Sequence, residues 1–222
     1  MKTDSELQQD VMTELKWEPP IRAAEIGVGV KDGAVTLTGV VDSYSKKWAA
    51  ERAARRVYGV KAVGEDIKVS LPSSYKRTDE DIAQSAKNTI DWNVWVPSGR
   101  VKVTVQNGWI TLSGDVDAYY QKEYAMDAVR HLIGVLGVTN SITIKPLVPI
   151  VKAFEVKSDI ENALRRNARL LLDAEKIQVE ISGSKVILRG SVGSWADYDE
   201  AGYAAYCAPG VSEVENNLRV TG

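Results

Sequence analysis

Hydrophobic positions alternate with polar ones in short runs, and the same succession of runs occurs three times along the chain. Apolar residues occupy every second position at 26–30, 101–105 and 177–181, which is typical of a half-buried strand. Each run leads into a dipeptide suited to a tight primed hairpin turn: Asp32-Gly33, Asn107-Gly108 or Gly183-Ser184. A second alternating run follows each turn. The pattern predicts three β-hairpins whose second strands bury one face.

Glycines mark the register of the repeat. Gly39, Gly114 and Gly190 lie in the middle of the predicted second strands, 75 and 76 residues apart. Gly59, Gly134 and Gly210 each follow 20 residues later and precede a third apolar run. Repetition at a fixed period indicates copies of one structural unit. A glycine inside a strand indicates that another backbone approaches closely there, and we expect a small-residue helix to pack against it.

Two helices complete each copy. The first is expected to begin at a capping residue with acidic groups in its first turn, near Asp4, Asp79 and Ser158. The second follows the hairpin, opens on an aromatic residue that closes the core, and carries an alanine-rich stripe facing the sheet. The opening residues are Tyr44, Tyr119 and Trp195.

These elements predict an α+β protein of three tandem αββαβ modules, each a small three-stranded mixed sheet covered on one face by two helices. The predicted modules are residues 1–72, 76–146 and 152–222. The sequence does not predict the order of the three strands within each sheet.

Composition narrows the classes of partner. Lys and Arg total 28 and Asp and Glu total 30, a formal net charge of -2, so a nucleic-acid partner is not expected. No apolar run approaches the roughly 20 residues of a membrane-spanning helix. The start of the chain is polar and lacks the features of a secretory signal. We expect a cytoplasmic protein if Met1 is the native start, and a periplasmic one if an export signal was removed.

Few residues suit catalysis or cofactor binding. The chain has one histidine and one cysteine, so no His-pair metal site, CxxC site or catalytic triad is expected, and no cofactor. Asp115 and Asp117 share one side of an extended segment, and we interpret Asp117 as a helix cap. His131 is expected in the last turn of a helix, and Cys207 as a half-buried small residue.

Two groups of residues are candidates for a binding surface. The first is basic and lies on the second helix of the first copy: Lys46, Lys47, Arg52, Arg55 and Arg56. It could meet lipid phosphates or an acidic partner, although Glu51 among these residues also fits an ordinary solvated face. The second is a set of tryptophans beside prolines, Trp17, Trp92 and Trp95, which could face a membrane interface or a peptide, or fill gaps between modules.

The repeated pattern of hairpin, central glycine, alanine-rich helix, Gly-Val pair and valine-rich strand resembles the BON domain family. The resemblance covers nearly the whole chain, with three copies where one or two are typical of the family. It implies a non-enzymatic module, proposed in this family to bind phospholipid surfaces and to act in osmotic stress.

Two hypotheses follow. The chain is a stress-response interaction scaffold for an unidentified protein or small ligand, or it is a peripheral binder of anionic phospholipid surfaces. The sequence leaves its oligomeric state open.

Overall fold

The computed structural model describes residues 2–148, 152–170 and 172–221. Met1 and Gly222, the outer limits of the first and third predicted modules, lie outside these ranges. Contacts between Cα atoms divide the chain into two compact units. One unit comprises Met1–Gly39, Ala49–Ile67 and Val148–Gly222, and the other comprises Val40–Trp48 and Lys68–Leu147.

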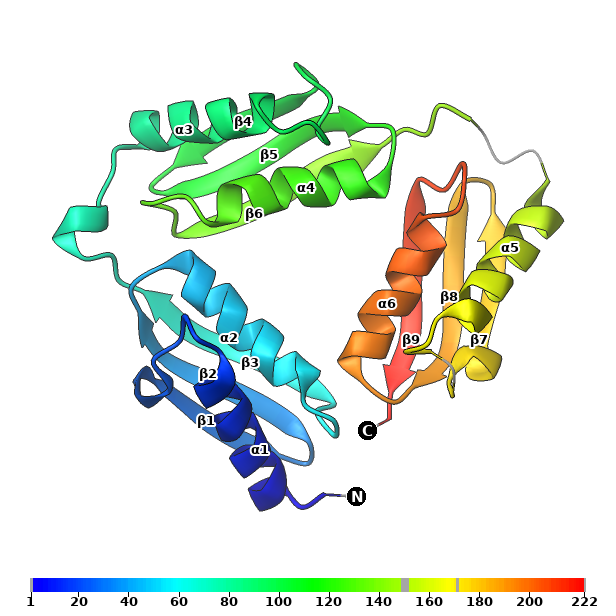
Figure 1. The fold of residues 1–222 in the computed structure, drawn as a ribbon, viewed down its shortest axis with the longest axis horizontal. Helices are drawn as coiled ribbons and strands as arrows, with labels where there is room; N and C mark the ends of the chain where they lie inside the picture. Colours follow the sequence, from blue (N-terminus) through cyan, green and yellow to red (C-terminus); the bar gives the residue numbers. More distant parts are fainter. Residues whose placement is uncertain (1, 149–151, 171, 222) are drawn as a thin grey trace. The chain divides into compact units, whose positions relative to one another are not determined.

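Each module runs helix, strand, strand, helix, strand, as the sequence predicts (Figure 1). Module 1 contains α1 (Asp4–Trp17), β1 (Ile26–Lys31), β2 (Ala34–Val41), α2 (Tyr44–Arg56) and β3 (Ala62–Val69). Module 2 contains α3 (Asp79–Asp91), β4 (Val101–Gln106), β5 (Trp109–Val116), α4 (Tyr119–Arg130) and β6 (Gly137–Ile144). Module 3 contains α5 (Ala153–Arg166), β7 (Ile177–Ser182), β8 (Lys185–Val192), α6 (Trp195–Tyr206) and β9 (Glu213–Val220). Single 3-10 turns lie at Ala23–Glu25, Ser73–Tyr75 and Ala174–Lys176.

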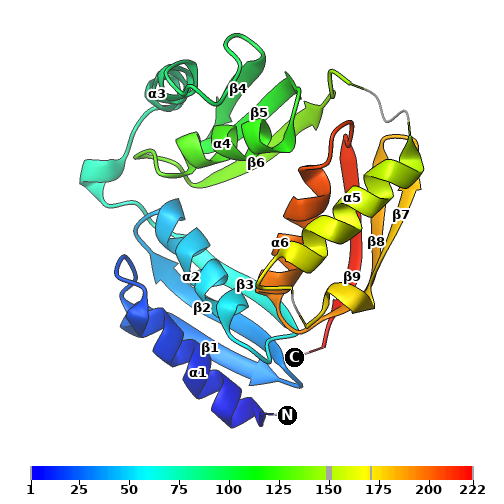
Figure 2. The ribbon, with the colours of Figure 1, turned by 45° about the vertical axis from the view of Figure 1, so that its right-hand side comes forward.

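The strand order, left open by the sequence, is the same in the three sheets of the described chain. The second strand is central, with the orders β1-β2-β3, β4-β5-β6 and β7-β8-β9. Each hairpin pair is antiparallel, whereas β6 and β9 run parallel to β5 and β8. The third strand must run parallel because a helix crosses from one end of the sheet to the other before it. Figures 1 and 2 show α5 and α6 on the same face of the module 3 sheet. The predicted fold class is therefore confirmed.

The hairpin turns adopt the backbone that their residues favour. Asp32 and Gly33 have φ of 53° and 81°, and Asn107 and Gly108 have φ of 50° and 74°, as a type I′ turn requires. In the third hairpin only Gly183, with φ of 60°, is in the left-handed region. The primed turns predicted from these dipeptides are confirmed.

The acidic residue that opens the first helix of modules 1 and 2 also ties that helix to the hairpin. The carboxylate of Asp79 accepts the amides of Asn107 and Gly108, both at 2.7 Å. Asp4 accepts the amides of Asp32 and Gly33 at 2.8 and 3.1 Å. These two carboxylates therefore satisfy turn amides, in addition to lying at the positive end of a helix.

Helix capping follows the prediction in two modules and departs from it in the third. Thr3 with Glu6 and Thr78 with Asp81 form capping boxes. The helix expected to start at Ser158 instead starts at Ala153, after Lys152, which makes no side-chain capping bond. The prediction misplaced this start because Lys152, at the N-cap, is not a capping residue, although Glu155 lies in the first turn as an acidic residue.

The core of each module lies between the sheet and its helices. The alternating residues of the central strand are buried as predicted; they are Val35, Leu37 and Val41, Ile110, Leu112 and Val116, and Val186, Leu188 and Val192. The alanine stripe faces them, with Ala50, Ala53, Ala125, Ala201 and Ala205 all fully buried. Small side chains allow the helix to lie close to the strand. Tyr44, Tyr119 and Trp195 open the second helices and are half-buried.

The central glycines do not serve the helix contact that the sequence suggested. Gly39, Gly114 and Gly190 have φ of 142°, 118° and 122°. A Cβ there would lie 2.2, 2.1 and 2.0 Å from the carbonyl oxygens of Glu25, Arg100 and Lys176. The backbone that approaches is therefore the entry to the paired first strand. The expectation that this glycine makes room for the helix is wrong, because the close contact lies within the sheet.

Gly59, Gly134 and Gly210 follow the second helices. Their φ values of 100°, 94° and 83° lie in the left-handed region, which suits a chain that leaves a helix and turns back to the sheet.

Candidate functional site

The basic residues predicted on α2 lie among carboxylates. Lys46 Nζ is 2.7 Å from Asp42 Oδ2. The guanidinium of Arg56 lies 2.8 Å from Glu14 and 2.7 Å from Glu18, and the hydrogen bond to Glu18 raises the pKa of Arg56. These bonds join the end of α2 to the end of α1. Two of the predicted cations therefore have a structural role within module 1.

Arg55 contacts two carboxylates and an aromatic ring. It lies 3.8 Å from Glu51 and 3.4 Å from Asp199, and its guanidinium carbon is 4.6 Å from the centre of the Trp195 ring. A guanidinium at this distance from an aromatic face is attracted by the ring quadrupole. Lys47 and Arg52 also have interaction partners. An anionic lipid headgroup would have to compete with carboxylates for three of the five cations.

The tryptophans proposed as a second surface are strongly exposed. Trp17 ends α1 and is 79% exposed, and Trp92, which follows α3, is 90% exposed. Trp95 lies in the loop between α3 and β4 and is 54% exposed. Trp92 and Trp95 share one loop of module 2, whereas Trp17 belongs to module 1. None of the three is buried as a plug within its own module.

Trp95 belongs to a cluster of three rings. Its indole stacks on Tyr124 with centroids 5.7 Å apart and planes 18° apart, and meets Tyr120 edge-on at 6.2 Å. Tyr120 and Tyr124 meet edge-on at 6.4 Å, and each is 40% exposed. The two tyrosines were not predicted as surface candidates. Their spacing of four residues, on the side of α4 away from the buried Ala125, was the signal in the sequence.

The loop that carries Trp95 is held in place by its own short turns. Val96 is 5% exposed and anchors the loop in the core of module 2. The side chain of Asn93 accepts the amide of Trp95 at 3.0 Å, and the Asn93 carbonyl accepts the amide of Val96 at 3.1 Å. On the same loop, Val94 is 87% exposed. We call Trp92, Val94, Trp95, Tyr120 and Tyr124 the aromatic patch.

Asp115 and Asp117 hold Arg100. Its two terminal nitrogens donate to Asp115 and Asp117, each at 2.6 Å, and this pairing lowers the pKa of Asp115. The N-cap of α4 is Ala118, and the side chain of Gln121 accepts its amide. The prediction that Asp117 caps the helix is therefore wrong, because Arg100, just before β4, takes its carboxylate.

The remaining reactive side chains occupy helix ends. His131 is the C-cap of α4, as expected at the end of this helix, and its Nδ1 lies 3.1 Å from Ser45 Oγ. Cys207 follows α6 and is exposed, so the expectation of a half-buried residue is wrong. Across the residues that the structure describes, no group of three or more His, Cys, Asp or Glu side chains is placed to hold a metal ion. Within the same residues, no helix has the length and apolar character needed to cross a membrane.

Comparison with known proteins identifies the repeated unit. The family model described as the BON domain matches residues 3–70, 78–146 and 153–222. The chain is 30% identical over 146 residues to the osmotically-inducible protein Y of Escherichia coli (strain K12), covering 64% of this chain and 73% of that protein.

Two solved structures of CdsD, a structural protein of the type III secretion system of Chlamydia trachomatis, align with the chain. One aligns over 97% of this chain and 92% of its own at 15% identity, with a TM-score of 0.25. The other, the C-terminal domain, aligns over 100% of both chains at 13% identity, with a TM-score of 0.27. The family assignment rests on the three sequence matches, which together span nearly the whole chain: this protein belongs to the BON domain family.

Proposed function

We propose that this chain is a non-enzymatic binding protein of the osmotic stress response, and that module 2 contacts a partner protein through the aromatic patch. The likeness to the osmotically-inducible protein Y supports the stress role. The observation that carries the binding role is the exposed ring cluster of Trp95, Tyr120 and Tyr124.

Exposed aromatic side chains of this kind are characteristic of interfaces. Trp and Tyr are enriched where proteins meet, and they dominate the energy of many complexes. The rings of Trp95, Tyr120 and Tyr124 already contact one another, so little side-chain entropy is lost when a partner covers them. Trp92 and Val94, on the same loop as Trp95, are almost fully exposed. A partner that covers this surface removes apolar area from water.

The same aromatic patch favours a second candidate function, contact with a membrane surface. Trp and Tyr concentrate at the level of the lipid headgroups, where an amphipathic ring finds both apolar and polar surroundings. The basic residues of α2 contribute less to this alternative, since Lys46, Arg55 and Arg56 are paired with carboxylates. A membrane contact through the aromatic patch should therefore depend weakly on anionic lipid and on salt.

A complementation experiment tests the proposal. In the source organism, the deletion strain would carry the wild-type chain, a double variant Trp92→Ser and Trp95→Ser, or the matched control Trp17→Ser. We expect the double variant to lose protection of growth after osmotic upshift while the control retains it. Equal protein levels, checked by immunoblot, exclude a folding defect. Full protection by the double variant contradicts the proposal.

Vesicles separate the two kinds of partner. The purified chain is sedimented with neutral and with anionic phosphatidylcholine-based vesicles at low and high salt. Absence of binding to both vesicle types supports a protein partner. Binding that the double variant loses, with little dependence on salt, supports the membrane alternative instead.

A further inference from the structure

Trp109 lies on the face of the module 2 sheet opposite the one that packs against α3 and α4. It begins β5, where the next residue, Ile110, points into the core and is fully buried. Side chains alternate along a strand, so Trp109 and Thr111 point to the opposite, solvent side. The indole of Trp109 is 48% exposed.

Two contacts hold this indole flat on the sheet. Its Nε1 donates to Thr139 Oγ1 on β6 at 2.8 Å. Trp109 pairs in register with Gly137 of β6, and a Cβ on Gly137 would lie 2.4 to 2.6 Å from three atoms of the six-membered ring. One face of the ring therefore rests on the Gly137 backbone, which leaves the other face to solvent. Such a preorganised ring loses little entropy when a ligand stacks on it.

The equivalent pairs of the other modules are built differently. The repeat spacing places Ala34 and Ala62 at these positions in module 1. In module 3 they are Lys185 and Glu213, which pair in register and form an ion pair at 2.9 Å. Among these three pairs, the combination of a large ring with a glycine beneath it occurs in module 2. We call the Trp109 indole on Gly137 the platform. It is a property of module 2 and is not required by the fold.

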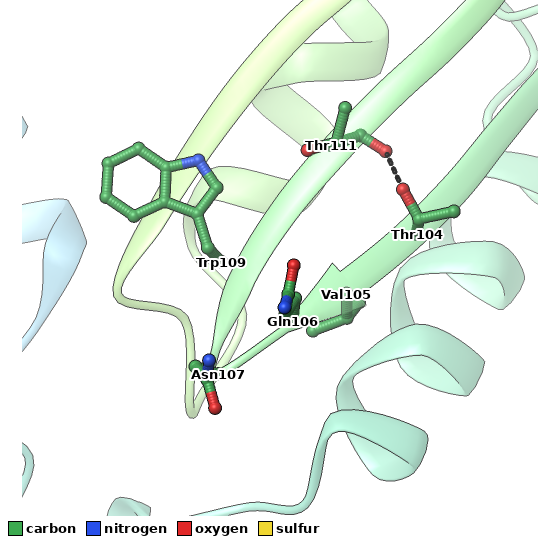
Figure 3. A pocket seen from close by; sticks show the side chains of 6 residues that line it. All are labelled: Thr104, Val105, Gln106, Asn107, Trp109 and Thr111. Atoms are coloured by element: carbon green, nitrogen blue, oxygen red, sulfur yellow. Dashed lines mark hydrogen bonds between the residues drawn. The ribbon is translucent and has the colours of Figure 1, made fainter.

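A half-open pocket of about 600 Å³ adjoins the platform on the β4-β5 hairpin. Thr104, Val105, Gln106, Asn107, Trp109 and Thr111 line it. Figure 3 shows the Trp109 indole on one side of β5 and the side chains of Gln106 and Thr104 on the other. Thr104 Oγ1 donates to the Thr111 carbonyl at 3.4 Å. The lining thus combines one aromatic ring with amides and hydroxyls, and none of the six residues is charged.

We propose that this pocket binds a neutral carbohydrate, with one sugar ring stacked on Trp109 and the hydroxyls of the adjoining ring hydrogen-bonded by Gln106 and Asn107. A pyranose has an apolar C–H face for the indole and a rim of hydroxyls for amides, which can both donate and accept. Nucleotides and acidic glycans fit less well, because the lining offers no cation to balance their charge. This inference is independent of the aromatic patch.

Nuclear magnetic resonance of the full ¹⁵N-labelled chain tests the site with maltohexaose, cellohexaose and the hexamer of N-acetylglucosamine. A Trp109→Phe variant identifies the Trp109 indole signal. Each sugar is titrated to about 10 mM, since a shallow neutral site is expected near a Kd of about 1 mM, or roughly −4 kcal/mol. We expect at least one sugar to shift the Trp109 indole signal and the Gln106 and Thr111 amides saturably.

Variants decide whether the platform is responsible. Trp109→Ala should weaken binding about tenfold or more, as removal of the stacking partner is worth at least about 1.4 kcal/mol. Gly137→Ala should also weaken it, because the new methyl group displaces the ring. The exposed Trp17→Ala is the matched control and should bind as wild type. The proposal is overturned if none of the three sugars shifts these signals, if Trp109→Ala binds equally well, or if a heparin hexasaccharide binds in preference.

Discussion

The substitution Gly39→Ala tests how the sheet of module 1 is closed. Alanine at φ of 142° occupies a sparsely populated backbone region, at a cost of about 1–3 kcal/mol. Its Cβ would lie 2.2 Å from the Glu25 carbonyl oxygen, so the backbone at the start of β1 must move. That movement disrupts the pairing of Ile26 with Gly39, at about 0.5–1.5 kcal/mol for each hydrogen bond lost.

With one hydrogen bond lost, the two costs add to about 1.5–4.5 kcal/mol. The stability of a module of this size is roughly 3–10 kcal/mol, from about 0.05–0.15 kcal/mol per residue, so the substitution removes a large part of it. Urea unfolding of the full chain, with hydrogen exchange followed in peptides spanning β1 and β2, measures the loss and locates it. Gly29→Ala is the matched control in the same hairpin, where a Cβ would meet no heavy atom within 4 Å. If the two variants unfold at the same urea concentration, the reasoning about this contact is refuted.

Three further predictions concern other contacts within module 2. Asp79→Ala should lower the free energy of unfolding by about 1.5–3 kcal/mol in a thermal unfolding assay, because two turn amides lose a charged acceptor. The neighbouring Glu80→Ala is the control and should change this free energy little. Arg100→Gln should destabilise the chain at neutral pH, because Arg100 lowers the pKa of Asp115 in the folded state. The difference in stability from wild type should persist above about pH 4 and vanish as the pH falls through that lowered pKa. A difference that does not depend on pH contradicts this reasoning. Ala125→Leu should cost about 1–3 kcal/mol in urea unfolding, because a fully buried position on α4 has no room for the larger side chain.

The repeat and most of its local structure could be predicted because they depend on neighbours in the sequence. Asn107-Gly108 supplies two residues that tolerate positive φ, so the turn follows from the dipeptide itself. Ile110 and Leu112 are buried because a period of two puts both on one face of a strand. The start of α5 at Ala153 could not be predicted in this way, since that helix begins without a side-chain cap.

The candidate surfaces were predicted less well than the fold, because exposure and pairing depend on residues far away in the chain. Arg56 looked available for an anionic ligand, but the fold brings Glu14 and Glu18 to it across 42 and 38 positions. For Trp95, the sequence left exposure and burial between modules both open, and its stacking on Tyr124 required the packing of the loop against α4.

Periodicity and the backbone preferences of single residues are enough to show that the chain holds three copies of one αββαβ unit, which face of each strand is buried and where each hairpin turns. Three other features depend on how the elements pack: the second strand is central, Gly39 makes room for the Glu25 carbonyl, and Trp109 rests on Gly137. These are contacts between elements. They depend on which surfaces pack together. The alternation along one strand predicts which of its faces is buried, but it does not predict which strand or helix packs against that face.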